Sequence, residues 1–241
     1  MDEDGGKPVN DFVDAIEFIF SERDSPAGGT RVGGLGEIWE LMWPHLKLSG
    51  ASLAIACAIA IPLGLWLGHR GRGGFLAINA SNVGRAVPSL ALIAFFVAWI
   101  GVGFTNLTLA LVLLAIPPVL TNTYTGVRQV DRDAVDSAEG MGMTGPQVVR
   151  RVELPLALPL IFGGIRTSAV NVVATATIAP LAGVVTLGDP IINVNTYGDE
   201  GRLAASIVVA LLAVATEVTL GAAQRVATPR GLRIDRREAV T

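Results

Sequence analysis

Residues 136–155 read DSAEGMGMTGPQVVRRVELP, a polar stretch that interrupts a largely apolar chain of 241 residues. Its marked positions are Asp136-Ser137-Ala138, Gly142 and Val152-Glu153-Leu154-Pro155. Apolar stretches precede and follow it, each long enough for a helix that crosses a bilayer. The sequence therefore predicts a short structured connection between two membrane helices.

Helix signals divide this connection into two parts. Asp131 or Asp133 can cap a first helix, and Gly140 and Gly142 can end it. Thr144 and Gln147 then have the spacing of a capping box at the start of a second helix. On the first helix, the spacing of Ala134, Ala138 and Met141 predicts one shared face. Small side chains on that face would let another protein approach closely.

Composition independently indicates a membrane protein, with 51% hydrophobic residues, 16% charged residues and a mean hydropathy of +0.55. A bilayer-spanning helix needs about 20 apolar residues. Windows of that kind lie at 45–68, 75–101, 106–127, 156–181 and 203–224. The predicted fold class is all-α, a polytopic helical membrane bundle of about five transmembrane helices.

Basic residues predict the orientation, because cytoplasmic loops carry an excess of Lys and Arg near the ends of spans. They follow the first span, surround the 136–155 stretch and follow the last span: Arg70, Arg72, Arg128, Arg132, Arg150, Arg151, Arg225, Arg230, Arg233, Arg236 and Arg237. The opposite loops are nearly free of them. With an odd number of spans, this places the N-terminus outside and the C-terminus inside.

The sequence divides into three parts. Residues 1–45 are predicted to form an acidic extracytoplasmic tail, in which Phe12, Ile16, Ile19 and Phe20 would give a short helix an apolar face at the membrane interface. Residues 46–226 form the transmembrane domain, and residues 227–241 form a basic cytoplasmic tail.

Three charged residues fall within the predicted spans. Arg85, Arg166 and Glu217 lie at similar depths in their windows, and a charge in lipid normally faces the bundle interior or a partner. We predict an ion pair or triad with Glu217 as the shared carboxylate. It has either a structural role or a role in switching between inward-facing and outward-facing states, and the structural role is favoured.

Polar residues within the spans mark helices that line a translocation path. The candidates are Asn122, Tyr124, Asn171 and Thr175. Ordinary interhelical packing, in which small and hydroxyl residues are also enriched, explains them equally well.

Several function classes find no support in the sequence. It has no phosphate-binding loop of the Walker type, and no catalytic Ser, His and carboxylate set. Cys57 is the only cysteine, and interfacial placement at opposite ends of one span explains His45 and His69. We expect no bound cofactor, metal or nucleic acid, and no enzymatic activity in this chain.

The 136–155 stretch resembles the EAA loop of ATP-binding cassette importer permeases. That pattern is Glu-Ala-Ala, three residues, Gly, nine residues, then Ile, any residue and Leu-Pro. Every spacing fits, with Asp136 and Ser137 in place of Glu and Ala, and Val152 in place of Ile. The resemblance implies a cytoplasmic coupling helix that contacts an ATPase through Ala134, Asp136, Ser137, Ala138, Met141, Gly142, Leu154 and Pro155.

Three further stretches, 85–92, 116–127 and 154–161, look like permeases of osmoprotectant importers. This resemblance covers about residues 46–226 and implies a five-helix core similar to that of the methionine importer. It implies a subunit that moves glycine betaine, choline, carnitine or proline by alternating access across the plasma membrane of a prokaryote. The family tends to have a glycine-rich stretch that ends in Gly-Leu-Gly after the fourth span. Residues 183–188 stand at that place but do not carry the full glycine pattern.

The partners implied are two ATPase subunits that hold ATP and Mg, a second permease that is identical or similar, and an extracytoplasmic substrate-binding protein. An importer for another small solute, such as an amino acid, is the alternative within transport. A secondary carrier without an ATPase is the alternative from another class, although no inverted repeat is visible in the sequence.

Overall fold

A computed structural model describes residues 8–71, 74–75, 79 and 86–228. The chain divides into two compact units. The first unit contains residues 1–51, 89–111 and 172–214, and the second contains residues 52–88, 112–171 and 215–241. Both units are built mainly of helices, which confirms the predicted fold class.

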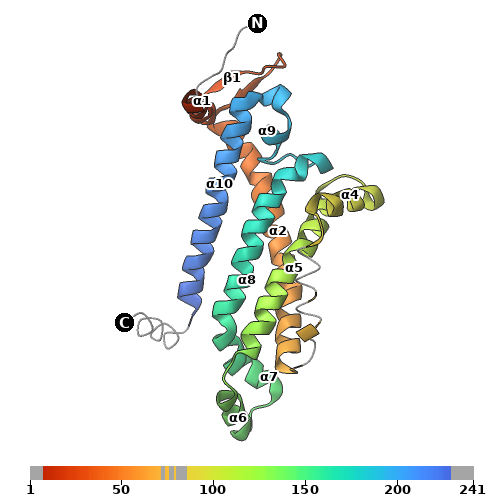
Figure 1. Ribbon diagram of the computed structural model, residues 1–241, viewed down its shortest axis with the longest axis vertical. Coiled ribbons are helices and arrows are strands. Elements are labelled where there is room, and N and C mark those ends of the chain that lie inside the picture. The colour runs from red at the N-terminus through yellow and green to blue at the C-terminus, as the bar shows by residue number, and fades with distance from the viewer. Residues whose placement is uncertain (1–7, 72–73, 76–78, 80–85, 229–241) are drawn as a thin grey trace. The chain divides into compact units, whose positions relative to one another are not determined.

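Four helical stretches in the described part of the chain are long and apolar enough to cross a membrane. They are α2 (Gly34–His69), α5 (Phe104–Arg128), the stretch Gly145–Ala182 that contains α8 (Leu154–Thr175), and α10 (Val194–Ala227). Colour identifies them along the chain in Figure 1. The predicted count of about five is therefore one higher than the described part shows.

The window at 75–101 accounts for this difference. Its described helix is α4 (Ser89–Ile100), which has 12 residues. Such a helix is about 18 Å long, which is shorter than the hydrocarbon core of about 30 Å. Much of the window before residue 86 lies outside the described residues.

Helix α2 begins at Gly34, well before the predicted span start at residue 45. Trp43 and Trp66 are exposed at two positions along α2, and a basic side chain lies over the ring of each. Lys47 Nζ lies 5.0 Å from the Trp43 ring centroid, and Arg70 Cζ lies 4.5 Å from that of Trp66. Their sequence separation corresponds to about 35 Å of helix, which fits two interfacial belts on either side of a bilayer core.

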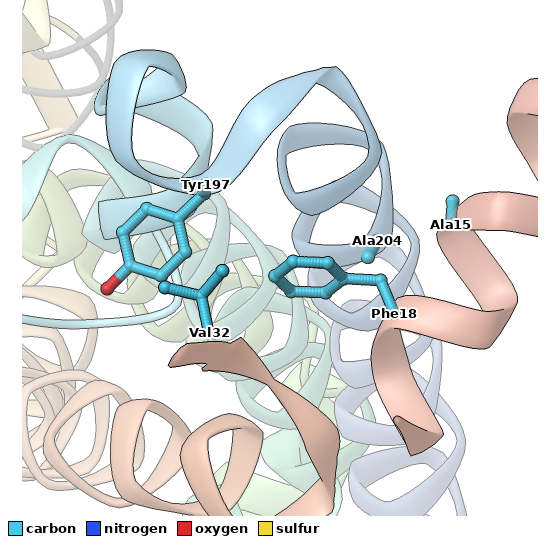
Figure 2. Packing of buried hydrophobic residues seen from close by; sticks show 5 residues of the cluster. All are labelled: Ala15, Phe18, Val32, Tyr197 and Ala204. Atoms are coloured by element: carbon cyan, nitrogen blue, oxygen red, sulfur yellow. The ribbon is translucent and has the colours of Figure 1, made fainter. Parts of the chain in front are cut away.

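In the first unit, an N-terminal helix and a hairpin pack on the start of α10. Helix α1 (Pro8–Phe20) precedes the antiparallel strands β1 (Glu22–Asp24) and β2 (Arg31–Gly33). Figure 2 shows Phe18 of α1 and Val32 of β2 between Tyr197 and Ala204 of α10. The short helix predicted here is present as α1, and Phe12, Ile16 and Phe20 are exposed. Ile19, the fourth member of the predicted apolar face, packs against the buried cluster instead. The placement of α1 at a membrane interface stays a prediction.

A tight turn in the same unit follows the 3-10 helix η2 (Ala176–Ala182) and leads to α9 (Asp189–Ile192). The buried Thr186 hydroxyl donates to the Ala176 carbonyl at 3.0 Å, and the Gly188 N–H donates to Thr186 Oγ1 at 3.2 Å. A Cβ atom at Gly188 would overlap the Thr177 carbonyl. The turn therefore requires glycine at this position.

In the second unit, glycines allow close approach of α2, α5 and α8. A Cβ atom at Gly64 would lie 2.7 Å from the Thr123 Cβ, and one at Gly68 would lie 2.6 Å from the Val127 Cβ. A Cβ atom at Gly164 of α8 would lie 2.7 Å from the Asn122 Cβ. Contacts of this kind are typical of helix packing in membranes.

We expect the Gly188→Ala substitution to destabilise the protein, because its methyl group forces the backbone at Thr177 to move. The cost should be about 2–3 kcal/mol, as for other overpacked sites. Thermal unfolding of the purified protein in detergent measures this as a lower Tm. Gly36→Ala is the matched control, because the space around its Cβ is open to 4 Å. Equal Tm values for the two variants would contradict the described turn.

Candidate functional site

The predicted first helix of the polar connection is present as α6 (Arg132–Gly140). Asp131 caps its start, since its Oδ1 accepts a hydrogen bond from the Asp133 N–H at 2.9 Å. At the other end, the Gly142 N–H donates to the Glu139 carbonyl at 2.8 Å, and the Met143 N–H donates to the Ala138 carbonyl at 3.1 Å. These are the two bonds of a Schellman motif, and Gly142 has the expected left-handed φ of +83°.

The predicted capping box is also present, at the start of α7 (Gly145–Val148). The Thr144 N–H donates to Gln147 Oε1 at 2.8 Å. A π-helical turn, η1 (Val149–Glu153), then connects α7 to α8. In Figure 1, α6 and α7 lie next to each other, and the two helices are in contact. The sequence analysis did not predict the π turn.

The connection has its own hydrophobic core, which corrects one part of the predicted partner face. Val135 and Ala138 of α6 are buried with Val130 and Val148, and Ala138 is only 2% exposed. Ala138 therefore packs within the chain and is not available to a partner. The prediction grouped it with Ala134 and Met141 by spacing alone, which cannot tell an inner face from an outer one.

The outer surface of the connection consists of polar and flexible side chains. Met141 is 72% exposed, and Asp136, Ser137 and Gly142 are exposed as well. Ala134, Leu154 and Pro155 are half-buried. The surface that another protein could touch is thus centred on Asp136, Ser137 and Met141.

A buried acidic residue in this connection was missed by the sequence analysis. Glu153 is 2% exposed, and its Oε2 lies 2.9 Å from Nδ1 of His69 at the end of α2. His69 is therefore not simply an interfacial residue. His45 differs from the prediction too, because it is buried and its Nε2 lies 3.0 Å from the Val173 carbonyl oxygen.

The predicted ion pair between Arg166 and Glu217 is confirmed. Gln224, which the sequence analysis did not include, extends it: Arg166 Nη1 donates to Gln224 Oε1 at 2.8 Å, and Gln224 Nε2 donates to the Pro159 carbonyl at 3.0 Å. The network joins α8 to the last part of α10. Arg85, the third predicted member, lies outside the described residues.

The predicted path-lining residues occupy different environments. Asn122 Nδ2 donates to the Pro118 carbonyl at 2.8 Å and lies against Gly164. Tyr124 is half-buried beside Gly74, Asn171 is exposed, and Thr175 is half-buried at the end of α8. Asn122 and Tyr124 thus take part in helix packing, and a path-lining role for all four residues remains a prediction.

Apolar helices long enough to cross a bilayer, joined by a capped polar connection, define a polytopic helical membrane protein. The chain belongs to the family described as binding-protein-dependent transport system inner membrane component, which it matches over residues 60–231.

Curated relatives are permease proteins of transport systems. The chain is 37% identical over 198 residues to the glycine betaine/carnitine/choline transport system permease protein OpuCB of Bacillus subtilis, covering 82% of this chain and 91% of that protein. It is 38% identical over 192 residues to the carnitine transport permease protein OpuCB of Listeria monocytogenes, covering 79% and 88%.

Solved structures share the fold at lower identity. An inward-facing structure of the MetNI methionine transporter matches with a TM-score of 0.69 at 19% identity, over 81% of this chain and 98% of that chain. A crystal structure of an amino acid ABC transporter with histidines matches with a TM-score of 0.59 at 17% identity, over 80% of this chain and 92% of that chain.

We expect removal of one partner of the Arg166–Glu217 pair to lower the yield of folded protein. Glu217→Leu leaves the Arg166 guanidinium without its carboxylate partner, and an unpaired charge within a membrane span is unfavourable. The double variant Arg166→Leu/Glu217→Leu removes both charges and should recover most of the yield. Fluorescence-detected size-exclusion chromatography measures this, and additive losses in the double variant would contradict a pairwise interaction.

Proposed function

We propose that this chain is the permease subunit of an ATP-driven importer for a compatible solute. The observation that carries the proposal is the capped helical connection 131–153, which presents Asp136, Ser137 and Met141 outward between two membrane helices. The solute class is supported by the relatives, whose names give glycine betaine, carnitine and choline. An amino acid or another small solute is the alternative that the test below distinguishes.

The physical requirement for such a subunit is a stiff connection to its energy source. The chain lacks a nucleotide-binding motif, so we propose two partner ATPase subunits that hold ATP and Mg. Caps at both ends of α6 and the buried cluster around Ala138 make the connection one packed body. Motion of an attached ATPase would then be passed directly into α5 and α8, between which the connection lies.

The remaining partners and the orientation complete this proposal. Arg70, Arg128, Arg150 and Arg151 lie at the ends of α2 and α5 and within the connection, which favours a cytoplasmic location for this part of the second unit. The N-terminal tail would then be outside the cell and the C-terminus inside. A second permease, identical or similar, and an extracytoplasmic substrate-binding protein would complete the importer.

Alternating access would move the solute between the two sides of the plasma membrane. Asn122, Tyr124, Asn171 and Thr175 are our candidates for contacts along the path. A quaternary ammonium is normally held by an aromatic cage, and the chain has only 6% aromatic residues. We therefore assign most of the solute selectivity to the external binding protein.

Uptake by the reconstituted complex tests the proposed function. The permease is purified with the ATPases and binding protein encoded beside it and inserted into vesicles that contain ATP and Mg. We expect ATP-dependent uptake of radiolabelled glycine betaine, choline, carnitine or proline. Uptake of an amino acid other than proline would favour the alternative solute class, and uptake without the ATPases would favour a secondary carrier.

Copurification tests the proposed contact surface on α6. The exposed pair of substitutions Asp136→Arg and Met141→Glu should lower ATPase capture about tenfold, which corresponds to 1.4 kcal/mol of binding free energy. Asp24→Arg in the hairpin is the control for the Asp136→Arg change, because it replaces the same acid by arginine at an exposed site in the first unit. Unchanged capture by the folded double variant would show that the ATPase binds elsewhere.

A further inference from the structure

The contact between His69 and Glu153 joins α2 to the helical connection 131–153. His69 is the last residue of α2, and Glu153 is the last residue of the π turn η1. Their side chains meet at 2.9 Å between Nδ1 and Oε2. The connection is already continuous with α5 and α8 through the backbone, whereas α2 lies far away in the sequence. Packing of Gly64 and Gly68 on α5 already links α2 to this part of the unit, and the His69–Glu153 contact adds a direct polar link between α2 and the connection.

The environment holds the imidazole in one orientation. A nearly fully buried carboxyl group needs a hydrogen-bond partner, and Glu153 finds one in His69, whose Nδ1 shares a hydrogen bond with Oε2 at 2.9 Å. On the other side of the ring, a Cβ atom at Gly145 would lie 3.0 Å from Nε2, so glycine permits the close approach of α7. The ring is thus held between Gly145 and Glu153, which belong to the two ends of the α7–η1 segment.

The backbone at Glu153 also departs from regular helix geometry. A π turn is rare, and such turns occur frequently at functional sites. Here the turn ends at the buried acid that contacts α2. Next to the contact on α2, Arg70 lies over the exposed Trp66 ring at 4.5 Å, which places His69 at the level of a membrane interface.

We propose that His69 and Glu153 form a latch that makes the cytoplasmic end of α2 move together with the coupling connection. This inference rests on the proposed importer function. When an ATPase displaces the connection, the latch carries the displacement into α2 in addition to α5 and α8. Without it, α2 follows the connection only through its packing on α5 at Gly64 and Gly68, and fewer solute molecules cross for each ATP consumed. His69 and Glu153 are positioning residues in this scheme, because they act through α2.

Substitutions that separate ring shape from hydrogen bonding test the latch. His69→Phe keeps a ring against Gly145 but has no donor, and Glu153→Leu removes the acceptor. His69→Asn places an amide nitrogen close to the position of Nδ1, whereas His69→Gln places it close to that of Nε2. Glu40→Leu, at an exposed position near the other end of α2, is the matched control for Glu153→Leu.

The readout is solute imported per ATP hydrolysed by the complex in vesicles, together with ATPase capture. For His69→Phe and Glu153→Leu we expect about a tenfold lower ratio with ATPase capture retained, as for loss of a charge-assisted hydrogen bond. His69→Asn should stay within about twofold of the wild type, and His69→Gln should resemble His69→Phe. A wild-type ratio in folded His69→Phe and Glu153→Leu complexes overturns the latch.

A distance measurement in protein that keeps His69 and Glu153 tests the proposal even if these variants fold poorly. Spin labels are attached at Arg70→Cys and Arg150→Cys in a Cys57→Ser background, and their separation is measured with and without ATP. If the latch holds, the distance between the two labels is the same with and without ATP. A distance that changes with nucleotide overturns the proposal. Absence of any uptake by the wild-type complex would instead contradict the proposed function, whatever the labels report.

Discussion

The bilayer core offers no hydrogen-bond partners, and this constraint determines where polar structure can occur in the chain. Within the long helices, backbone groups largely satisfy one another, although Pro117 and Pro118 of α5 and Pro159 of α8 supply no N–H. In the polar connection, groups at the helix ends find partners: Asp131 caps α6, Gly142 allows the two bonds that close it, and Thr144 caps α7 with Gln147. The polar connection is therefore a folded segment in which both short helices have capped ends.

Close packing supplies the rigidity of the second unit. Gly64 and Gly68 of α2 meet α5 at distances that leave no room for a side chain, and Gly126 and Gly164 do the same between α5 and α8. In lipid, where the hydrophobic effect does not drive helices together, such contacts gain dispersion energy instead. Buried Ala138 extends this principle to the connection, since its small side chain lets α6 pack closely on α7.

Local signals in the sequence predicted the features that depend on local chemistry. The helix caps, the capping box, the short N-terminal helix and the Arg166–Glu217 pair all follow from spacing or from the cost of a charge in lipid. Burial of Ala138, the π turn and the contact between His69 and Glu153 depend on how distant segments meet, which spacing cannot reveal. The early start of α2 was missed because the acidic character of residues 1–45 concealed its continuous helical pattern.

In the proposed importer, displacement of the connection by an ATPase has to move several helices. The backbone links the connection to α5 and α8. Side chains link it to α2, through the packing of Gly64 and Gly68 on α5 and the contact between His69 and Glu153. Two helices that meet only through apolar side chains can slide past each other at little cost. If Glu153 separates from His69, its buried carboxyl group loses its described hydrogen-bond partner, and the free-energy cost of that unpaired group opposes the sliding. A polar contact between packed helices thus fixes their relative position more strictly than a larger apolar contact does, because it has a single favourable register.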